Sequence, residues 1–96
     1  YASTKAPRSY AQAEYPRDVF LVFGRESRGL PENLLERVYD RCIRIPMIEG
    51  ARSLNLSNSV AIVTYEALRQ HNFEHLLDHG ALTGRDEEPG AWMDYL

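Results

Sequence analysis

The sequence places small polar and basic residues directly before an apolar stretch that looks like part of a buried helix. Residues 52–58 read RSLNLSN, and residues 60–63 read VAIV, with only Ser59 between them. Ser and Asn side chains at a helix start accept hydrogen bonds from free backbone N–H groups, and such a start can also hold a polar or anionic ligand. Asn55 or Ser57 is the predicted N-cap. We expect this patch to project into a ligand site, with the buried helix behind it as support.

A second polar segment follows an apolar run. Residues 19–23 read VFLVF, which is typical of a strand covered on both faces in a parallel sheet. Residues 24–29, GRESRG, then form a polar turn between two glycines. Ligands of α/β sheets bind beyond the carboxyl ends of strands. The two polar segments are therefore predicted to meet at one edge of the sheet.

The elements needed to position these segments can be read from local patterns. The expected order is a strand end at residues 1–5, a strand at 19–23, a helix at 30–40, a strand at 42–47, a helix at 56–71 and an amphipathic piece at 73–79. From Val60 to Leu68 the residues are apolar on most sides, so the long helix is expected to be covered all round. The pattern favours an α/β fold with a parallel sheet flanked by helices. Residues 1–80 form the predicted domain, and residues 81–96 an acidic tail.

Composition limits the class of protein. The 96 residues are 44% hydrophobic and 26% charged, as in ordinary soluble globular domains. No apolar run approaches the roughly 20 residues of a membrane-spanning helix, and the chain start lacks a signal-peptide pattern, so we expect a cytoplasmic protein. The single cysteine, Cys42, cannot form an internal disulfide and is predicted to lie in the core.

Charge is unevenly distributed along the chain. The net charge is −3, but residues 1–52 hold nine Lys or Arg against seven Asp or Glu, while residues 53–96 hold two against seven. A polyanion would therefore meet the first half of the chain. His71, His75 and His79 share one helix face, which superficially resembles a metal site, but no Cys or carboxylate is clearly aimed at them. A solvated face is the preferred interpretation, and no metal is predicted.

Three stretches carry a family resemblance. LVFGRESRGLP, CIRIPM and RSLNLSNSVAIVTYEALRQ resemble the second and third signature motifs of the SPOUT class of RNA methyltransferases, in particular the SpoU-like ribose 2′-O-methylases. Within that class they are most similar to the tRNA methyltransferases of the wobble nucleotide, cytidine or uridine 34. The resemblance covers about residues 1–70. It implies a C-terminal trefoil knot, S-adenosylmethionine as methyl donor, tRNA as substrate, and a homodimer to which residues 56–70 contribute.

The resemblance also implies roles for individual residues. The cofactor-binding positions are Ala2, Gly24, Ile45 and Ser53. Asn55, Ser57, Tyr65 and Glu66 are the predicted catalytic residues, and Arg28 and Arg52 the predicted RNA-phosphate contacts. The alternatives are structural: Gly24 serving only a turn, Asn55 and Ser57 serving only as caps, and Tyr65 packing in a core.

Members of the resembled family begin with a further segment that carries a first motif with an Asn and an Arg. We therefore expect this chain to be the C-terminal portion of a longer protein. Two alternative functions stay open: a catalytically incomplete module that binds S-adenosylmethionine and dimerises, and a ribosomal RNA 2′-O-methyltransferase of the same class.

Overall fold

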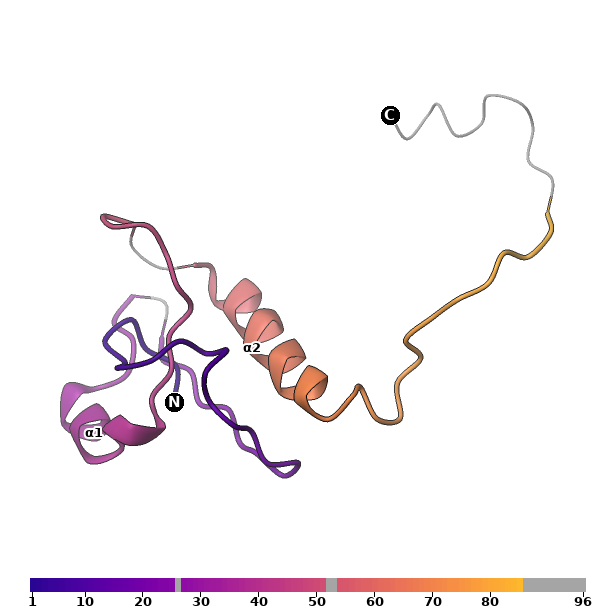
Figure 1. Cartoon of the computed structure of the whole chain (residues 1–96). Coiled ribbons are helices and arrows are strands. Elements are labelled where there is room, and N and C mark those ends of the chain that lie inside the picture. The colour runs from indigo at the N-terminus through magenta and orange to yellow at the C-terminus, as the bar shows by residue number, and fades with distance from the viewer. Residues whose placement is uncertain (26, 52–53, 86–96) are drawn as a thin grey trace.

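The computed structural model describes residues 1–25, 27–51 and 54–85 (Figure 1). Its helical elements are α1 (Glu32–Arg37), the 3-10 helix η1 (Tyr39–Arg41) and α2 (Leu56–Gln70). The helix predicted over residues 30–40 is therefore split. The N–H of Val38 donates to the carbonyls of both Leu34 and Leu35, and its backbone leaves the helical region at φ −119°. After Val38 the chain continues as the more tightly wound 3-10 helix η1.

Four short segments lie side by side in parallel. Ala2 is bridged to both Phe23 and Ile43, and Ser9 is bridged to Arg44. The Ala2 N–H donates to the Val22 carbonyl at 2.9 Å, and the Ile43 N–H donates to the Tyr1 carbonyl at 2.9 Å. The spatial order is therefore 22–23, 1–3, 42–44 and 8–10. This agrees with the parallel arrangement predicted from the sequence.

The pairing is shorter than the predicted strands. Within the described residues, bridges are isolated, and residues 19–22 and 45–47 take part in none of them. The predicted strands at 19–23 and 42–47 are wrong in extent, because a strand is defined by a paired neighbour and these segments have one at a single end only. The apolar run was a sound guide to direction, but not to length or burial. Phe20 is 91% exposed, so the prediction of a segment covered on both faces is wrong.

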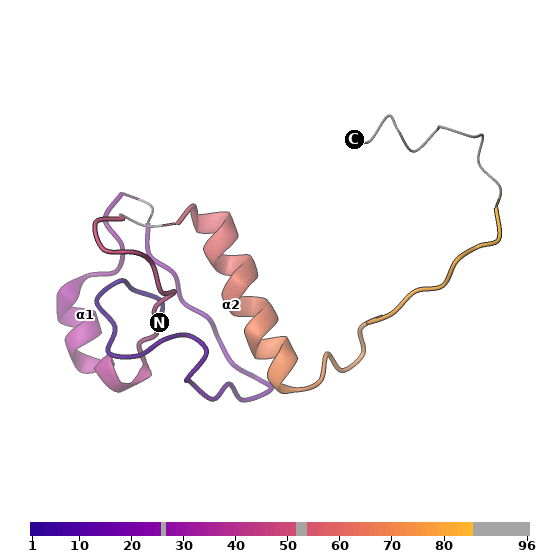
Figure 2. The same cartoon turned by 45° about the horizontal axis from the view of Figure 1, so that its top comes forward.

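Helices lie on both faces of the aligned segments (Figure 2). Successive residues of an extended segment point to opposite faces. Ile43 accordingly packs with Val63 and Ala67 of α2 and with Tyr15, while Cys42 packs with Leu35 and Val38 on the α1 side. Cys42 is fully buried, which confirms its predicted place in the core.

Helix α2 begins as predicted but is covered on one face only. The Asn55 carboxamide accepts hydrogen bonds from the N–H groups of Ser57 at 2.8 Å and Asn58 at 3.4 Å, so Asn55 is the N-cap. Val63, Glu66 and Ala67 are buried. The prediction of a helix covered all round is wrong, because Tyr65 is 60% exposed and Val60 38% exposed. Apolar residues on the outer face of α2 are left to solvent.

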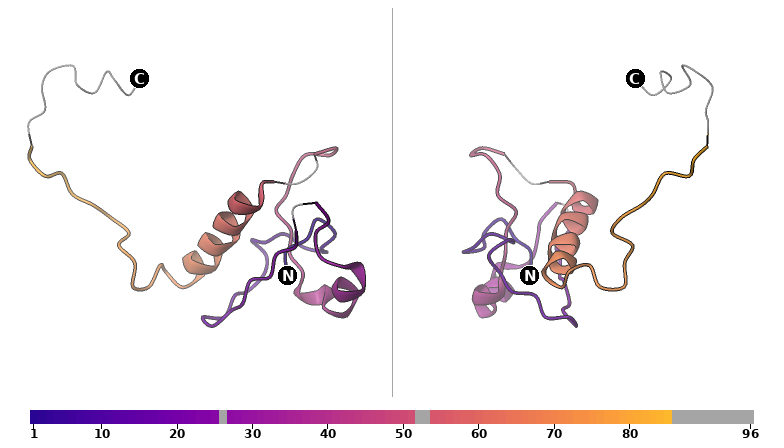
Figure 3. Two further views of the ribbon diagram at one scale, coloured as in Figure 1. Left: turned by 180° about the vertical axis from the view of Figure 1, so that it is seen from behind. Right: turned by 45° about the vertical axis from the view of Figure 1, so that its right-hand side comes forward.

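The amphipathic helix predicted over residues 73–79 is also wrong. Asn72, Phe73 and His75 have φ values of 58°, 53° and 66°. This left-handed backbone cannot continue a right-handed helix. The chain turns after α2 and packs Phe73 against Tyr65, with ring centroids 6.4 Å apart and ring planes tilted by 45°. It then runs away from the helices (Figure 3).

The carboxyl end of α2 is clamped to residues 13–17. The Gln70 carboxamide accepts from the Tyr15 N–H at 3.0 Å and donates to the Ala13 carbonyl at 2.8 Å. It also donates to Glu66 at 2.8 Å, and this contact sets which end of the amide faces Tyr15. Outside this core, Arg17 makes a two-fold contact with Glu74, at 2.9 and 2.8 Å. The clamp joins α2 to the chain between the aligned segments 8–10 and 22–23.

Two pKa values report on this cluster. Hydrogen bonds from Arg69 and then Gln70 lower the pKa of Glu66, so the carboxylate is charged at neutral pH. Burial, and then the negative charge of Glu66, raises the pKa of Tyr15 to about 12. The Tyr15 hydroxyl is therefore protonated and donates to the Tyr10 carbonyl at 2.7 Å.

These shifts predict acid sensitivity. A carboxyl whose pKa is lower in the folded chain adds stability above its unfolded pKa, about 4.3, and loses it as pH falls through the folded value. Unfolding in urea, followed by circular dichroism from about pH 6 to about pH 3, should therefore show falling stability. The same window contains Glu74, whose pKa is lowered by Arg17.

Glu66→Gln should be about 1–3 kcal/mol less stable at neutral pH, because hydrogen bonds to a charged group are lost. It should also lose part of the acid dependence. Glu36→Gln, on the exposed side of α1, is the matched control and should behave like the wild type. An unchanged pH profile in Glu66→Gln would contradict the assignment.

Candidate active site

A pocket of about 310 Å³ lies at the carboxyl end of the aligned segments. It is bounded by the residues after each of three of them and by the first turns of α2. The lining residues are Ala2, Ser3, Thr4, Lys5, Phe23, Gly24, Arg25, Arg28, Gly29, Leu30, Ile43, Arg44, Ile45, Met47, Leu54, Leu56, Ser59 and Val63. A second cavity, beside residues 12–22, contains none of the predicted site residues. The first pocket thus lies at the edge where sequence analysis predicted a ligand site.

The turn at residues 24–29 forms one wall of the pocket. The Gly29 N–H donates to the Arg25 carbonyl at 2.7 Å, which closes the turn. Gly29 has φ 69°, a conformation that costs glycine little. At Gly24, an added Cβ would lie 2.2 Å from the Gly29 carbonyl carbon and 2.4 Å from the Leu30 nitrogen. Gly24 is therefore required by the close approach of the two arms of the turn, and Gly29 is favoured by its positive φ.

A second turn, at residues 3–5, forms the facing rim. The Ala6 N–H donates to the Ser3 carbonyl at 3.2 Å, and the Lys5 N–H donates to the Ser3 hydroxyl at 3.1 Å. The Arg44 guanidinium donates to the Thr4 carbonyl at 3.1 Å and ties this turn to the aligned segment 42–44. Backbone and side-chain bonds thus hold the Ser3, Thr4 and Lys5 side chains at the pocket.

The remaining wall is apolar and contains free backbone. Ile43, Ile45 and Leu56 lie with Val63 along the pocket. Among bonds between described residues, neither the N–H nor the C=O of Ile45 has a partner. Main-chain donors and acceptors can read the edge of a heterocycle. This wall therefore suits a flat ligand with an apolar face and polar edges.

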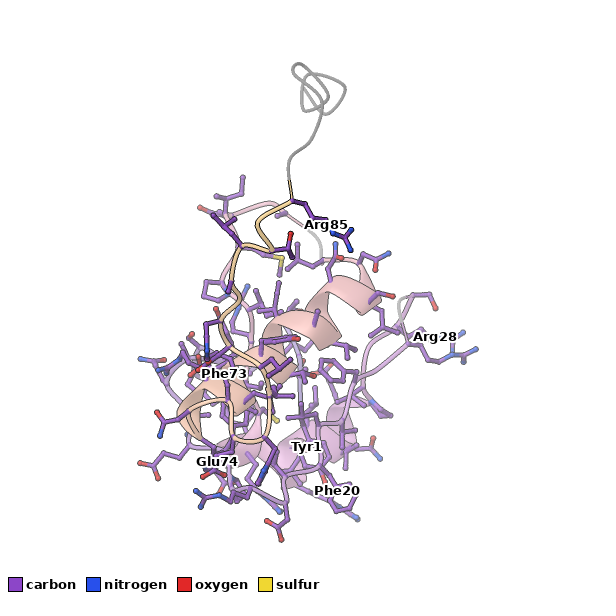
Figure 4. All side chains as sticks on the ribbon, turned by 90° about the vertical axis from the view of Figure 1, so that its right-hand side faces the viewer. Tyr1, Phe20, Arg28, Phe73, Glu74 and Arg85 are labelled. Atoms are coloured by element: carbon purple, nitrogen blue, oxygen red, sulfur yellow. The ribbon has the colours of Figure 1, made fainter. Side chains whose placement is uncertain are left out.

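The charge of the pocket is opposite to that of the chain. Lys5, Arg25, Arg28 and Arg44 line it, and the described part of its lining holds no carboxylate. The whole chain has a net charge of −3. Figure 4 shows the Arg28 side chain projecting from its loop into solvent. The pocket mouth is thus a local cationic patch, which favours an anionic group.

The structure brings together some of the predicted site residues. Ala2, Gly24, Ile45 and Arg28 all line the pocket, although they come from three separate segments. Arg52 and Ser53 lie outside the described residues. Their predicted roles stay predictions.

The four predicted catalytic residues are not in the described lining. Asn55 and Ser57 flank the pocket residue Leu56, and the Asn55 side chain is engaged in capping. Tyr65 stacks on Phe73, and Glu66 belongs to the clamp with Gln70. Asn55 and Ser57 are therefore close to the pocket along the chain, while Tyr65 and Glu66 lie further along α2. Their catalytic roles stay predictions.

Sequence reasoning missed several lining residues. Leu56, Ser59 and Val63 share one helix face through their spacing of three and four residues, a signal that was available. Residues 3–5 lie at the carboxyl end of the aligned segment 1–3. The rule that ligands bind beyond the carboxyl ends of strands pointed to residues 24–29 and applies equally to residues 3–5. Met47 and Leu54 belong to a loop whose path no local pattern determines.

Other site classes find no support in the described residues. No group of three His, Cys, Asp or Glu side chains there could hold a metal ion. His79 contacts Asp78 at 2.8 Å, away from His71, which bonds to the Tyr15 carbonyl. Among the helices in residues 1–25, 27–51 and 54–85, none has the length and apolarity to cross a bilayer.

Known proteins are similar to most of this chain. The SpoU rRNA Methylase family matches residues 1–65. A Burkholderia ambifaria protein named tRNA (cytidine(34)-2′-O)-methyltransferase is 53% identical over 68 residues, which are 70% of this chain and 43% of that protein. A Saccharophagus degradans protein of the same name is 43% identical over 72 residues, 74% of this chain and 47% of that protein. This chain spans about half the length of these relatives.

Solved structures agree. One, described as a candidate RNA methyltransferase from Bacillus anthracis, superposes with TM-score 0.74 at 43% identity and covers 82% of this chain and 52% of its own. Another, from work on 2′-OH methylation of C/U34 on tRNA, gives TM-score 0.69 at 40% identity, with 76% and 47% covered. The aligned segments and α2 thus have the SPOUT fold. The chain belongs to the SpoU rRNA Methylase family, as its motif resemblance predicted.

Proposed function

We propose that the protein containing this chain transfers a methyl group from S-adenosylmethionine to a ribose 2′-hydroxyl of tRNA, at cytidine or uridine 34. The observation that carries the proposal is the meeting of Ala2, Gly24 and Ile45 in one pocket. The names of the similar relatives support the tRNA substrate over the ribosomal alternative.

The pocket is suited to this cofactor in volume and chemistry. Its volume of about 310 Å³ lies at the lower end of ordinary ligand pockets, about 300–1,000 Å³. Ile43, Ile45 and Leu56 would cover the adenine faces, and the Ile45 backbone would meet its polar edge. Ser53 is proposed as a further contact.

The bound cofactor would supply an activated methyl group. It would do so by exchanging its C–S bond for the new C–O bond, and the hydroxyl proton would pass to solvent. The task of the chain is alignment, since holding two reactants in line accounts for much of the rate of such a step. We assign Asn55 and Ser57, at the start of α2 beside Leu56, to positioning the ribose, and Tyr65 and Glu66 to supporting roles. Arg28 and Arg52 are the proposed phosphate contacts.

The finer fold assignment is also a proposal. The parallel alignment of residues 1–3, 22–23 and 42–44 is compatible with a parallel sheet. The SPOUT fold supports a trefoil knot built from the loops that surround the pocket. We further propose a cytoplasmic location, which the free and buried thiol of Cys42 supports.

We propose that the protein is a homodimer and that α2 lies at its interface. The outer face of α2 exposes Val60, Ala61 and Tyr65 along about one and a half turns. Phe73 extends this apolar surface by stacking on Tyr65. Such a face is typical of an interface core.

One alternative is supported by a specific observation. The chain spans about half the length of its relatives, so it could by itself be a cofactor-binding and dimerisation module that lacks part of the catalytic apparatus. Cofactor binding without methyl transfer would distinguish this module from the enzyme.

The cofactor assignment predicts a large effect of one methyl group. Gly24→Ala should weaken binding of S-adenosylhomocysteine by at least about tenfold, equal to 1.4 kcal/mol, because the new Cβ meets backbone atoms of Gly29 and Leu30. Isothermal titration calorimetry measures this. Gly80→Ala is the control, because nothing lies within 4 Å of its Cβ, and its affinity should be unchanged. Equal affinities in folded Gly24→Ala and wild type would reject the pocket as the cofactor site.

The dimer assignment predicts that Ala61→Arg produces monomers. Ala61 is exposed, so the fold of one chain should tolerate arginine, while a charge buried in an apolar interface is costly. Sedimentation velocity measures the change. Asn33→Arg, on α1, adds the same charge outside the proposed interface and should stay dimeric. A dimeric Ala61→Arg variant would remove α2 from the interface.

A further inference from the structure

We infer that Lys5 binds a backbone phosphate of the RNA substrate. In the free protein Lys5 pairs with Glu32, and the phosphate displaces Glu32 when RNA binds. The inference rests on the proposed RNA substrate and adds to it a residue and a release step. Lys5 is the single lysine of the chain. Lys5 lies outside the three family motifs and is not among the residues predicted to contact RNA.

The backbone places Lys5 at the rim of the pocket. Its N–H donates to the Ser3 hydroxyl at 3.1 Å, and the Arg44 guanidinium holds the preceding Thr4 carbonyl at 3.1 Å. The backbone of Lys5 thus lies in a turn that is held by hydrogen bonds, although its side chain is 58% exposed. A backbone held in place and an exposed ammonium suit a side chain that must reach an incoming RNA strand.

The present partner of Lys5 is easily exchanged. The Lys5 ammonium lies 2.9 Å from a carboxylate oxygen of Glu32, whose side chain is 78% exposed. Ion pairs between exposed side chains are weak and are screened by salt. Glu32 lies at the first residue of α1 and is not among the pocket-lining residues. A phosphate entering at the mouth could therefore replace Glu32 at little cost.

The surroundings of Lys5 favour an anion from solvent. Arg25 and Arg28, on the facing turn, line the same pocket, and Arg28 projects outward (Figure 4). A strand crossing the mouth would meet cations on two sides. The ammonium of lysine is a compact charge that commonly binds phosphate. Because Lys5 is largely exposed, an RNA phosphate fits it better than the carboxylate of a cofactor lying inside the pocket.

Two variants that break the same ion pair distinguish a role of Lys5 in RNA binding from a role of the ion pair in the fold. Lys5→Met removes the proposed ligand, whereas Glu32→Gln removes only its competitor. If the pair merely supports the fold, both variants should act in the same direction. If Lys5 binds phosphate, Lys5→Met should weaken RNA binding and Glu32→Gln should strengthen it. Arg37→Met and Glu36→Gln, both on α1 and outside the pocket lining, make the same changes in net charge and serve as matched controls.

The probe is a synthetic RNA hairpin with cytidine in its loop, and its binding to the full 96-residue chain is followed by fluorescence anisotropy. One lost phosphate contact should lower the slope of log K against log salt by about 0.7–0.9. The ratio of affinities between wild type and Lys5→Met should therefore shrink about threefold between about 50 and about 200 mM salt. Both controls should keep the wild-type slope.

Calorimetry with S-adenosylhomocysteine on the same variants identifies which proposal fails. Unchanged cofactor binding with opposite effects on RNA binding is the expected result. RNA affinity in Lys5→Met equal to that in Arg37→Met, or equal weakening in Lys5→Met and Glu32→Gln, overturns the inference and leaves the proposed function intact. Weaker cofactor binding in Lys5→Met with unchanged RNA binding would assign Lys5 to the cofactor carboxylate and also overturn it. A wild-type chain that binds neither probe would reject the proposed function together with the inference.

Discussion

Backbone pairing around Ala2 is the constraint on which the pocket depends. Its segment lies between Phe23 and Ile43, held by bonds of 2.9 Å on each side. Because the three segments run in the same direction, the residues that follow them emerge at one edge. Each segment alone would expose unpaired backbone groups and have no fixed neighbour. The pocket exists only where the three continuations meet.

Side chains maintain this alignment from the opposite end. The Gln70 carboxamide joins α2 to residues 13 and 15, and Glu66 sets its orientation. The same helix carries Leu56 and Val63 into the pocket. A residue of the family motif can thus serve function by fixing a helix rather than by meeting substrate. This offers a physical reason for a charged residue on the buried face of α2.

Charge distribution separates the site from the rest of the chain. The described lining carries four cations, while the chain as a whole is acidic. Short-range cationic contacts suit a substrate whose charge is regularly spaced along a backbone. The acidic remainder restricts such binding to the pocket mouth. In this arrangement Glu32 would act as an internal competitor, and its weak pair with Lys5 keeps the site available.

Local patterns were sufficient for much of this protein. The Asn55 cap, the extent of α2, the burial of Cys42 and the parallel direction of the chain followed from side-chain chemistry and periodicity. The motif resemblance also singled out Ala2, Gly24 and Ile45, which line one pocket. Tertiary structure decided how far each strand pairs, which face of α2 is covered, and that Glu66 binds Gln70 at 2.8 Å outside the pocket lining. These features depend on neighbours distant in sequence, and a local pattern records what a residue can do but not what lies across from it.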